Sequence, residues 1–526
     1  MSAWRRALLI GALLTMKLCW AQPASQPQAD EGPAFDVFEF RIEGNSLLST
    51  IAIERAVYPH LGPGRHINDV EAARRGLEAT YRDAGFSTVV VDIPVQKVAD
   101  GVVVLSVTEG RLDTVRVIGS RYYSQGSILA RTQTLAAGEA PYFPELQQEL
   151  DRLNRSADRR ITPVLRAGAL PGTTAIDLKV DDRLPLHASA ELNNRYSANT
   201  TRLRLNGAAR YDNFLDRDHS IGLQFQASPQ DWDEVKVWLF NYAVPLASGS
   251  MYGYVIDSKS NVAAVSNTTV LGQGRIYGLR YAQPLQPRGS LAHAFTAGFD
   301  FKHFDEVVTQ TGTPGLKTPL DYVPFSLDWS GSVQGTKSRS QFSLGTVFSF
   351  RDLSGSDDLE FDAKRFNAKS NFLILRTDLQ HERPVFGTYS LLLALSGQIA
   401  DQPLVSNEQF FAGGAASVRG YLEAEVLGDV GARGSAELRT PDLAGGRFGW
   451  LRELRGFTFL DGAHARVRDP LPFQQERFTL SSAGLGLRLA ASAAFDALVS
   501  VAWPFKDTVY THAGVARSQF SASYRY

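Results

Sequence analysis

Two short segments of the chain carry the residue types from which a buried ion pair is built. The first consists of four consecutive residues, Val418, Arg419, Gly420 and Tyr421. The second begins 40 residues after Arg419 and contributes Phe459, Asp461 and Gly462. A guanidinium presents a planar fork of N–H donors that matches a carboxylate with two bonds. A buried guanidinium needs such a partner, because removing either one would leave a buried charge without its counterion.

The sequence contains few other arrangements that could perform chemistry. It has no Gly-x-Ser-x-Gly nucleophile elbow and no His-Glu-x-x-His zinc motif, and its nine histidines form no cluster at ligand spacing. The Gly-rich stretch 331–338 has the wrong spacing for a phosphate loop. Carboxylates such as Asp357 and Asp358 suit a solvated loop better than a calcium site. We therefore expect no catalytic residue, no metal and no cofactor.

Composition narrows the class of protein. The chain has 526 residues, enough for two or three folding units. It is 44% apolar with a net charge of −1, which argues against a nucleic-acid binder, because such proteins usually carry a basic excess. The same balance excludes gross disorder. With 45 glycines and 30 phenylalanines, the composition favours β architecture.

The N-terminus is typical of a secretory signal peptide, which we place at residues 1–21. An arginine pair precedes the apolar run Ala7–Met16, and Ala21 supplies a small residue at the cleavage position. An uncleaved anchor helix is the alternative, but the apolar run is too short to span a bilayer comfortably. The only cysteine, Cys19, would leave with the signal. We therefore expect no disulfide and no cysteine-based metal site in the mature protein.

After a Pro- and Gln-rich linker, residues 22–34, one pattern of elements occurs twice, in 35–110 and in 111–183. Each copy reads as a strand, two helices and two strands. Each ends in a hairpin, whose turn is an Asp-Gly pair at 100–101 in the first copy and a Pro-Gly pair at 171–172 in the second. The matched order indicates a duplicated module rather than two unrelated α+β domains. A three-stranded sheet leaves an open edge, to which an extended peptide could add a strand.

The longer helix of each copy has its own signals. In the first copy, Asn68 is expected to cap a helix whose apolar positions recur at helical spacing until Gly85 ends it. In the second copy, Pro144 suits the first helical turn. The apolar stripe of that second helix consists of Leu146, Leu150 and Leu153.

Residues 184–526 show a period of two in place of the helical period. In the stretch 295–302, apolar residues alternate with a set that includes Asp300 and Lys302. In a membrane barrel, one side of each strand meets lipid and the other meets a polar lumen. A water-filled channel tolerates charges on the inner side, whereas a dry core would not. The charged residues that we assign to this inner side are Arg202, Arg204, Arg210 and Lys302.

A soluble β-sandwich with one solvated face is the competing interpretation of this region. Aromatic residues at the strand ends favour a membrane barrel, because such residues form its interfacial girdles. The chain also ends in an alternating aromatic segment, Phe520–Tyr526, which suits the last strand of a closed sheet. At about 20 residues per strand and loop, the region allows roughly 16 strands. We therefore predict a transmembrane antiparallel β-barrel of about 16 strands, preceded by two small α+β modules.

Three features resemble one superfamily of outer-membrane proteins. The duplicated modules resemble POTRA domains, the periplasmic modules of that superfamily. Residues 418–421 are similar to the signature of its inward-folded sixth loop, and residues 459–462 are similar to the strand motif that receives the loop arginine. The resemblance therefore implies that Arg419 and Asp461 pair inside the barrel. Two such modules with a barrel of this length resemble the two-partner-secretion transporters of the hemolysin secretion/activation type. The resemblance covers nearly all of the mature chain.

The chain departs from that family pattern at two places. Many such transporters carry an N-terminal plug helix, but residues 22–34 would reach only about 20 Å as a helix, so we expect no plug. Gly462 follows Asp461 directly, whereas the family often places the glycine one residue further on. The local bend of that strand is therefore expected to differ, while the carboxylate stays available.

The resemblance implies a transporter of the bacterial outer membrane, with its modules in the periplasm. It would recognise an unfolded client, a large β-rich exoprotein, and pass it through the lumen to the exterior. The loop held by Arg419 and Asp461 would lie where the client must pass. Two alternatives remain open: a factor that inserts other barrels into the membrane, and a passive porin or adhesin. The expected partners are the client and the lipid bilayer, without nucleic acid, and the protein is not expected to be an enzyme.

Overall fold

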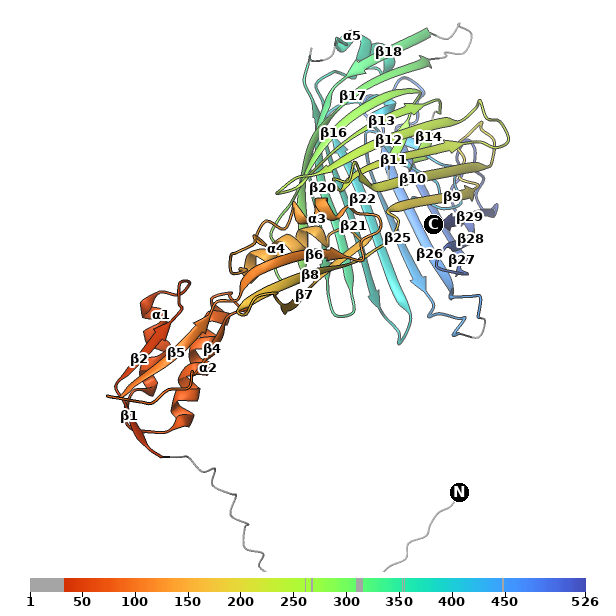
Figure 1. The fold of residues 1–526 in the computed structure, drawn as a ribbon. Helices are drawn as coiled ribbons and strands as arrows, with labels where there is room; N and C mark the ends of the chain where they lie inside the picture. The colour runs from red at the N-terminus through yellow and green to blue at the C-terminus, as the bar shows by residue number, and fades with distance from the viewer. Residues whose placement is uncertain are drawn as a thin grey trace, which may run out of the picture. The chain divides into compact units, whose positions relative to one another are not determined.

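The computed structural model describes residues 33–260, 262–265, 268–308, 316–351, 353, 355–446 and 449–526. The expected signal peptide with Cys19, and nearly all of the expected linker, lie outside the described residues. The chain forms two compact units (Figure 1). One contains the residues up to Ser120 together with Ile128–Asp181, and the other contains Arg121–Ser127 together with Asp182–Tyr526.

The first unit begins with a small module of mixed strands and helices. Its elements are β1 (Phe35–Val37), β2 (Glu39–Glu43), α1 (Thr50–Val57), the 3-10 helix η1 (Tyr58–His60), β3 (Gly62–Arg65), α2 (Ile67–Asp83), β4 (Val90–Asp92) and β5 (Val102–Thr108). Strand β5 lies at the centre of a three-stranded sheet, parallel to β2 and antiparallel to β4. The buried faces of α1 and α2 pack on β5 around Leu77 and Leu105. Both β2 and β4 are edge strands of this sheet.

The first residues of α2 correct one expectation. The helix begins at Ile67, and its N-cap is His66, so the prediction that Asn68 caps it is wrong. The backbone N–H of His66 donates to the Asp69 carboxylate at 2.9 Å, which completes a capping box two residues before the expected one. The other end agrees with the sequence, because α2 ends at Asp83 and Gly85 follows with a φ of +96°.

The second module repeats the order of the first. Its elements are β6 (Arg111–Ile118), α3 (Gln125–Leu129), α4 (Phe143–Leu153), β7 (Arg159–Ala167) and β8 (Thr173–Asp182). The strand order is β6-β8-β7, and β8 runs parallel to β6, as β5 runs parallel to β2. Pro144 lies in the first turn of α4, and Leu146, Leu150 and Leu153 are buried, as predicted. Among the described residues, no helix is both long and apolar enough to cross a membrane.

The rest of the chain forms a closed antiparallel barrel, in which β29 pairs with β9 (Figure 1). Strands β18 and β19 both pair with β17 and are separated only by Val323, so together they occupy one position of the barrel. Counted in this way, the described residues form sixteen barrel strands, as predicted. The strands are β9 (Leu186–Asn193), β10 (Arg204–Phe214), β11 (His219–Ala227), β12 (Lys236–Pro245), β13 (Ser250–Ser258), β16 (Gly274–Pro284), β17 (Leu291–Val308), β18 (Leu316–Tyr322), β19 (Pro324–Gln334), β20 (Arg339–Ser349), β21 (Leu373–Pro384), β22 (Ser390–Ala400), β25 (Val430–Arg439), β26 (Glu453–Arg466), β27 (Arg477–Ala490), β28 (Phe495–Pro504) and β29 (Arg517–Arg525).

The period of two separates the outer face of the barrel from its lumen. In β17, Phe299 and Phe301 are exposed on the outside, while Asp300 is buried toward the inside. Arg202 does not belong to the inner set, because β10 begins only at Arg204 and Arg202 is exposed. The backbone N–H of Arg202 donates to the side chain of Gln230 at 2.9 Å instead of joining the strand ladder.

An apolar cluster fills part of the lumen at the barrel end opposite the start of β9. The long connection between β20 and β21 contributes the helix α5 (Asp358–Lys364) to it, with Phe361 buried. We call this set the mouth cluster, and its members are Val237, Leu239, Ile256, Ile276, Phe304, Leu320, Tyr322, Phe361, Ala368, Phe372, Ile374, Ala400, Leu404 and Val405. A hairpin of β14 (Val262–Val265) and β15 (Thr268–Leu271) connects β13 to β16 at the same end.

Candidate functional site

The connection between β22 and β25, residues 401–429, carries the first sequence motif, and we call it the motif loop. It contains the 3-10 helix η2 (Ser406–Glu408) and two short strands, β23 (Phe410–Ala412) and β24 (Val426–Gly428), which pair antiparallel. Val418 and Tyr421 are buried and pack with Ala463 of β26 and Leu480 of β27. The motif loop therefore folds against the inner wall of the barrel.

The motif arginine meets the predicted carboxylate. Arg419 Nε donates to Asp461 Oδ2 at 2.7 Å, and Nη2 donates to Oδ1 at 2.8 Å. The backbone N–H of Arg419 adds a third bond to Asp461, at 3.1 Å. The Asp461 side chain has no exposed surface, and that of Arg419 is 13% exposed. The predicted pairing inside the barrel is therefore confirmed, with the two-pronged geometry that binds a guanidinium most firmly.

A second carboxylate at this site did not emerge from the sequence. Arg419 Nη1 donates to Glu437 Oε2 at 2.6 Å, and Nη2 also reaches Ser435 Oγ at 3.1 Å. Glu437 is shared, because Arg439 Nε donates to its other oxygen at 2.8 Å. The alternation along β25 would have revealed this set, since Ser435, Glu437 and Arg439 occupy every second position and so face the lumen together.

Phe459 completes the site by placing its ring against one face of the guanidinium. The Arg419 guanidinium carbon lies 3.5 Å from the centroid of the Phe459 ring, close enough for a cation–π contact. Gly484 on the neighbouring strand makes room for this ring, because a side chain there would collide with it at 2.3 Å. Leu460, between Phe459 and Asp461, points outward and is 58% exposed. Alternation in β26 thus brings the aromatic ring and the carboxylate to the same guanidinium.

The other motif residues fix the backbone and the tip of the loop. Gly420 has a φ of +92°, and a Cβ there would lie 3.1 Å from the Cβ of Ala502. The Tyr421 hydroxyl lies within hydrogen-bond distance of the carbonyl oxygens of Ser481 and Lys506, at 3.1 and 3.0 Å, and can donate its hydrogen to either. Gly462, by contrast, has ordinary strand geometry, and its nearest neighbour to a built Cβ is 3.8 Å away. Nothing in the structure requires glycine at position 462.

Strands β9 and β29 close the barrel, and the loop tip contacts the segments next to both of them. The backbone N–H of Glu423 donates to the carbonyl of Tyr196, just after β9, at 3.1 Å. Glu425 accepts from the hydroxyl of Thr511, just before β29, at 2.7 Å. The carboxylate of Glu425 also binds the hydroxyl of Thr508. These bonds tie the motif loop to the segment that follows β9 and to the connection between β28 and β29.

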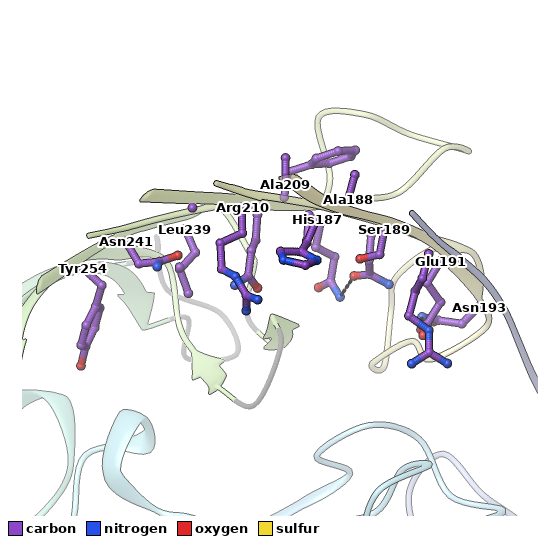
Figure 2. A pocket seen from close by; sticks show the side chains of 18 of the residues that line it. His187, Ala188, Ser189, Glu191, Asn193, Ala209, Arg210, Leu239, Asn241 and Tyr254 are labelled. Carbon is purple, nitrogen blue, oxygen red and sulfur yellow. Dashed lines mark hydrogen bonds between the residues drawn. The ribbon is translucent and has the colours of Figure 1, made fainter. Parts of the chain in front are cut away.

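A cavity of about 930 Å³ lies along the inner face of β9 to β13. Figure 2 shows Glu191, Arg210 and Asn241 projecting from the wall into this space. Phe411 and Glu423 of the motif loop line it as well. The polar lining combines neutral amides with charged side chains. The amides are Asn193, Asn206, Gln224, Gln226 and Asn241, and the charged residues are Glu191, Arg195, Arg210, Arg280, Glu423 and Arg525.

Comparison with known proteins identifies the family. The model of the haemolysin secretion/activation protein family ShlB/FhaC/HecB matches residues 172–489, more than half of the chain. The chain belongs to this family. A model of the ShlB-type POTRA domain also matches residues 35–110.

Curated relatives of this haemolysin secretion/activation protein include outer-membrane transporters. It is 21% identical over 434 residues to the outer membrane transporter CdiB of Dickeya dadantii, covering 79% of this chain and 74% of the relative. It is 20% identical over 425 residues to the heme/hemopexin transporter protein HuxB of Haemophilus influenzae, covering 78% and 74%.

Solved structures show the same fold. CdiB from Escherichia coli superimposes with a TM-score of 0.61 at 17% identity, over 97% of this chain and 93% of that one. BamA from Haemophilus ducreyi lacking POTRA domains 1–3 superimposes with a TM-score of 0.57 at 14% identity, over 94% and 100%. The family, the barrel and the POTRA-type modules place this chain in the bacterial outer membrane, where it translocates a secreted client.

Proposed function

We propose that the client is a large β-rich exoprotein that crosses the barrel in an extended state. The cavity of about 930 Å³ supports this proposal. A folded domain of 100 residues has a radius of gyration of about 13 Å, which is far too large for that space. An extended chain presents one donor and one acceptor per residue. Amide side chains offer both partners, so the amides of the β9–β13 wall can bind the main chain of a client whatever its sequence.

We assign client docking to the first module. A groove of about 470 Å³ lies between β2 and α1 and is lined by Phe38, Ile53 and Val57. Strand β2 is an edge of its sheet, and Phe38 just before it is exposed. An extended client segment could add to β2 through its main chain and place alternate side chains in the groove. The exposed apolar side chains on the outer barrel face would contact the lipid bilayer.

We assign the positioning of the motif loop to the pair of Arg419 and Asp461, with Phe459, Glu437 and the backbone of Gly420 as supports. The division of the chain that goes with this function is a signal peptide (1–21), a linker (22–34), two POTRA-like modules (35–110 and 111–183) and a barrel (184–526). No step of the proposed transport uses a catalytic residue of this chain, a metal or a cofactor.

The observation that carries the proposal is the polar cavity beside the anchored loop, and a deletion experiment tests it. Secreted proteins and outer-membrane barrel proteins are compared in the parent strain and in a strain that lacks this gene. Loss of one large exoprotein from the medium is the expected result. A general fall in barrel proteins would show an assembly factor instead, and unchanged levels of both would show a passive pore.

The role of the motif arginine is tested in the complemented strain. Arg419→Ala is expected to reduce export of the client while the barrel still reaches the outer membrane, as followed by heat-modifiable gel mobility. Undiminished export by this variant would refute the functional role of the loop position.

A further inference from the structure

The motif loop contains a second buried charge in its first limb, residues 404–408. Glu408 ends η2, eleven residues before Arg419, and its side chain is 1% exposed. A carboxylate in such a position is tolerated only when cations and hydrogen bonds compensate for the lost water. Its partners therefore identify what the limb is built against.

Four wall strands supply those partners. Lys302 of β17 binds the Glu408 carboxylate, Tyr322 of β18 donates its hydroxyl to Oε1 at 2.9 Å, and Arg376 Nη2 of β21 lies 3.3 Å from Oε2. Gln398 of β22 donates to the Glu408 carbonyl oxygen at 2.9 Å. None of these strands takes part in the Arg419 site, which is built on β25 and β26.

The same limb contributes to the mouth cluster. Leu404 and Val405, just before η2, are 1% exposed and belong to that cluster together with Phe361 of α5. Tyr322 joins the two sets of contacts, because its hydroxyl binds Glu408 while its ring centroid lies 5.6 Å from that of Phe361. Displacing Glu408 would therefore also disturb the apolar contacts of the mouth cluster.

We propose that Glu408 is a second positioning residue of the motif loop, which holds the first limb (residues 404–408) against β17–β22 independently of Arg419. Loss of its charge frees that limb and uncovers the mouth cluster, while Arg419 keeps residues 418–421 in place. Its consequence for export rests on the proposed function, but the displacement of the limb is measured without any client.

Thiol accessibility tests the proposal directly. The chain has one cysteine, Cys19, in the expected signal peptide, so an introduced cysteine is the only thiol expected in the mature barrel. Val405→Cys reports on the first limb. Val418→Cys reports on the second limb, residues 418–421. Both native side chains are buried. Each is placed in three backgrounds, namely otherwise unchanged, Glu408→Gln and Arg419→Ala, and reacted with a membrane-impermeant maleimide on intact cells.

In the Glu408→Gln background, Val405→Cys should react about tenfold faster, through local opening, and Val418→Cys should not change. The Arg419→Ala background should give the reverse pattern. Continued protection of Val405→Cys in Glu408→Gln would overturn the proposal. Faster reaction of both cysteines there would also overturn it, because Glu408 would then support the whole fold.

Two further variants separate positioning from general damage. Glu408→Asp keeps the charge and should restore much of the protection of Val405→Cys. Lys302→Gln should expose Val405→Cys less than Glu408→Gln does, because Arg376 and Tyr322 still bind the carboxylate. The double variant should be no worse than Glu408→Gln alone, because Lys302 acts through its contact with Glu408. Additive effects would argue against a shared contact. If export falls only in Arg419→Ala while the labelling pattern holds, the positioning role stands and its link to transport fails.

Discussion

The motif loop is held by two ionic anchors that differ in design. At the second limb, one guanidinium is gripped by two carboxylates of adjacent strands and stacks on an aromatic ring. At the first limb, one carboxylate is surrounded by a lysine, an arginine and a tyrosine from strands spread over a broad sector of the wall. The first arrangement fixes the orientation of a single side chain. The second links several strands through a single carboxylate, that of Glu408.

The two anchors should therefore respond differently when one of their charges is removed. Removal of Asp461 leaves the guanidinium with Glu437 and Ser435, but without its two-pronged partner. Removal of the Glu408 charge leaves Lys302 and Arg376 without their shared anion, beside a small cavity that both of them line. We therefore expect damage at either anchor to open its own limb, and damage at the Arg419 anchor to cost more of the free energy of unfolding.

The largest expected effect is that of Asp461→Ala. Breaking a buried pair by removing one partner typically costs about 3–5 kcal/mol, so we expect a loss of that order in the free energy of unfolding. The measurement is urea unfolding in lipid vesicles, followed by heat-modifiable gel mobility. Glu437→Ala is the matched comparison and should lose less, because Asp461 accepts three bonds from Arg419 and Glu437 accepts one.

A smaller effect is expected for Arg419→Lys. The ammonium keeps the charge but loses the fork and the stacking on Phe459, so the free energy of unfolding should fall by about 1.5–3 kcal/mol. The same urea titration measures it. A lysine variant as stable as the parent protein would show that the charge alone holds this limb, as we propose for Glu408.

Gly420→Ala probes the backbone between the two contacts of the second limb. At a φ of +92°, a side chain is strained, and we expect a loss of about 1–2 kcal/mol. Gly462→Ala is the control, because its φ is not positive and a Cβ there meets only an ordinary contact. Equal losses in the two variants would show that the turn at Gly420 is not what positions Arg419.

The smallest effect is expected for an ion pair that lies in water. Arg466 and Glu476 pair at 2.9 Å, but their side chains are 54% and 38% exposed. Glu476→Gln should change the free energy of unfolding by less than about 1 kcal/mol, and the difference should shrink in high salt. A loss as large as that of Asp461→Ala would contradict the view that burial gives the loop anchors their strength.

The Arg419 anchor could be predicted because each half of it lies in a short, recognisable segment. Glu437 could have been found from the alternation of β25. Glu408 could not, since its partners Lys302 and Tyr322 lie 106 and 86 residues away and no local pattern joins them. Only the closed barrel brings these positions together.

The errors at element ends have a common physical cause. The period of two continues through Arg202, but pairing begins at Arg204 because Gln230 takes the intervening backbone donors. At α2, both Asn68 and His66 stand near a suitable acidic residue, and the geometry of the preceding turn selects His66. Periodicity locates an element well, whereas its first residue depends on side chains that compete for a few backbone groups.

The bonds from the tip of the motif loop impose an order on biogenesis. Tyr421 and Glu425 bind residues 506–511, which connect β28 to β29. The loop tip cannot reach its final position before β28 and β29 have joined the sheet. Closure of the barrel would therefore come before the final placement of the loop tip.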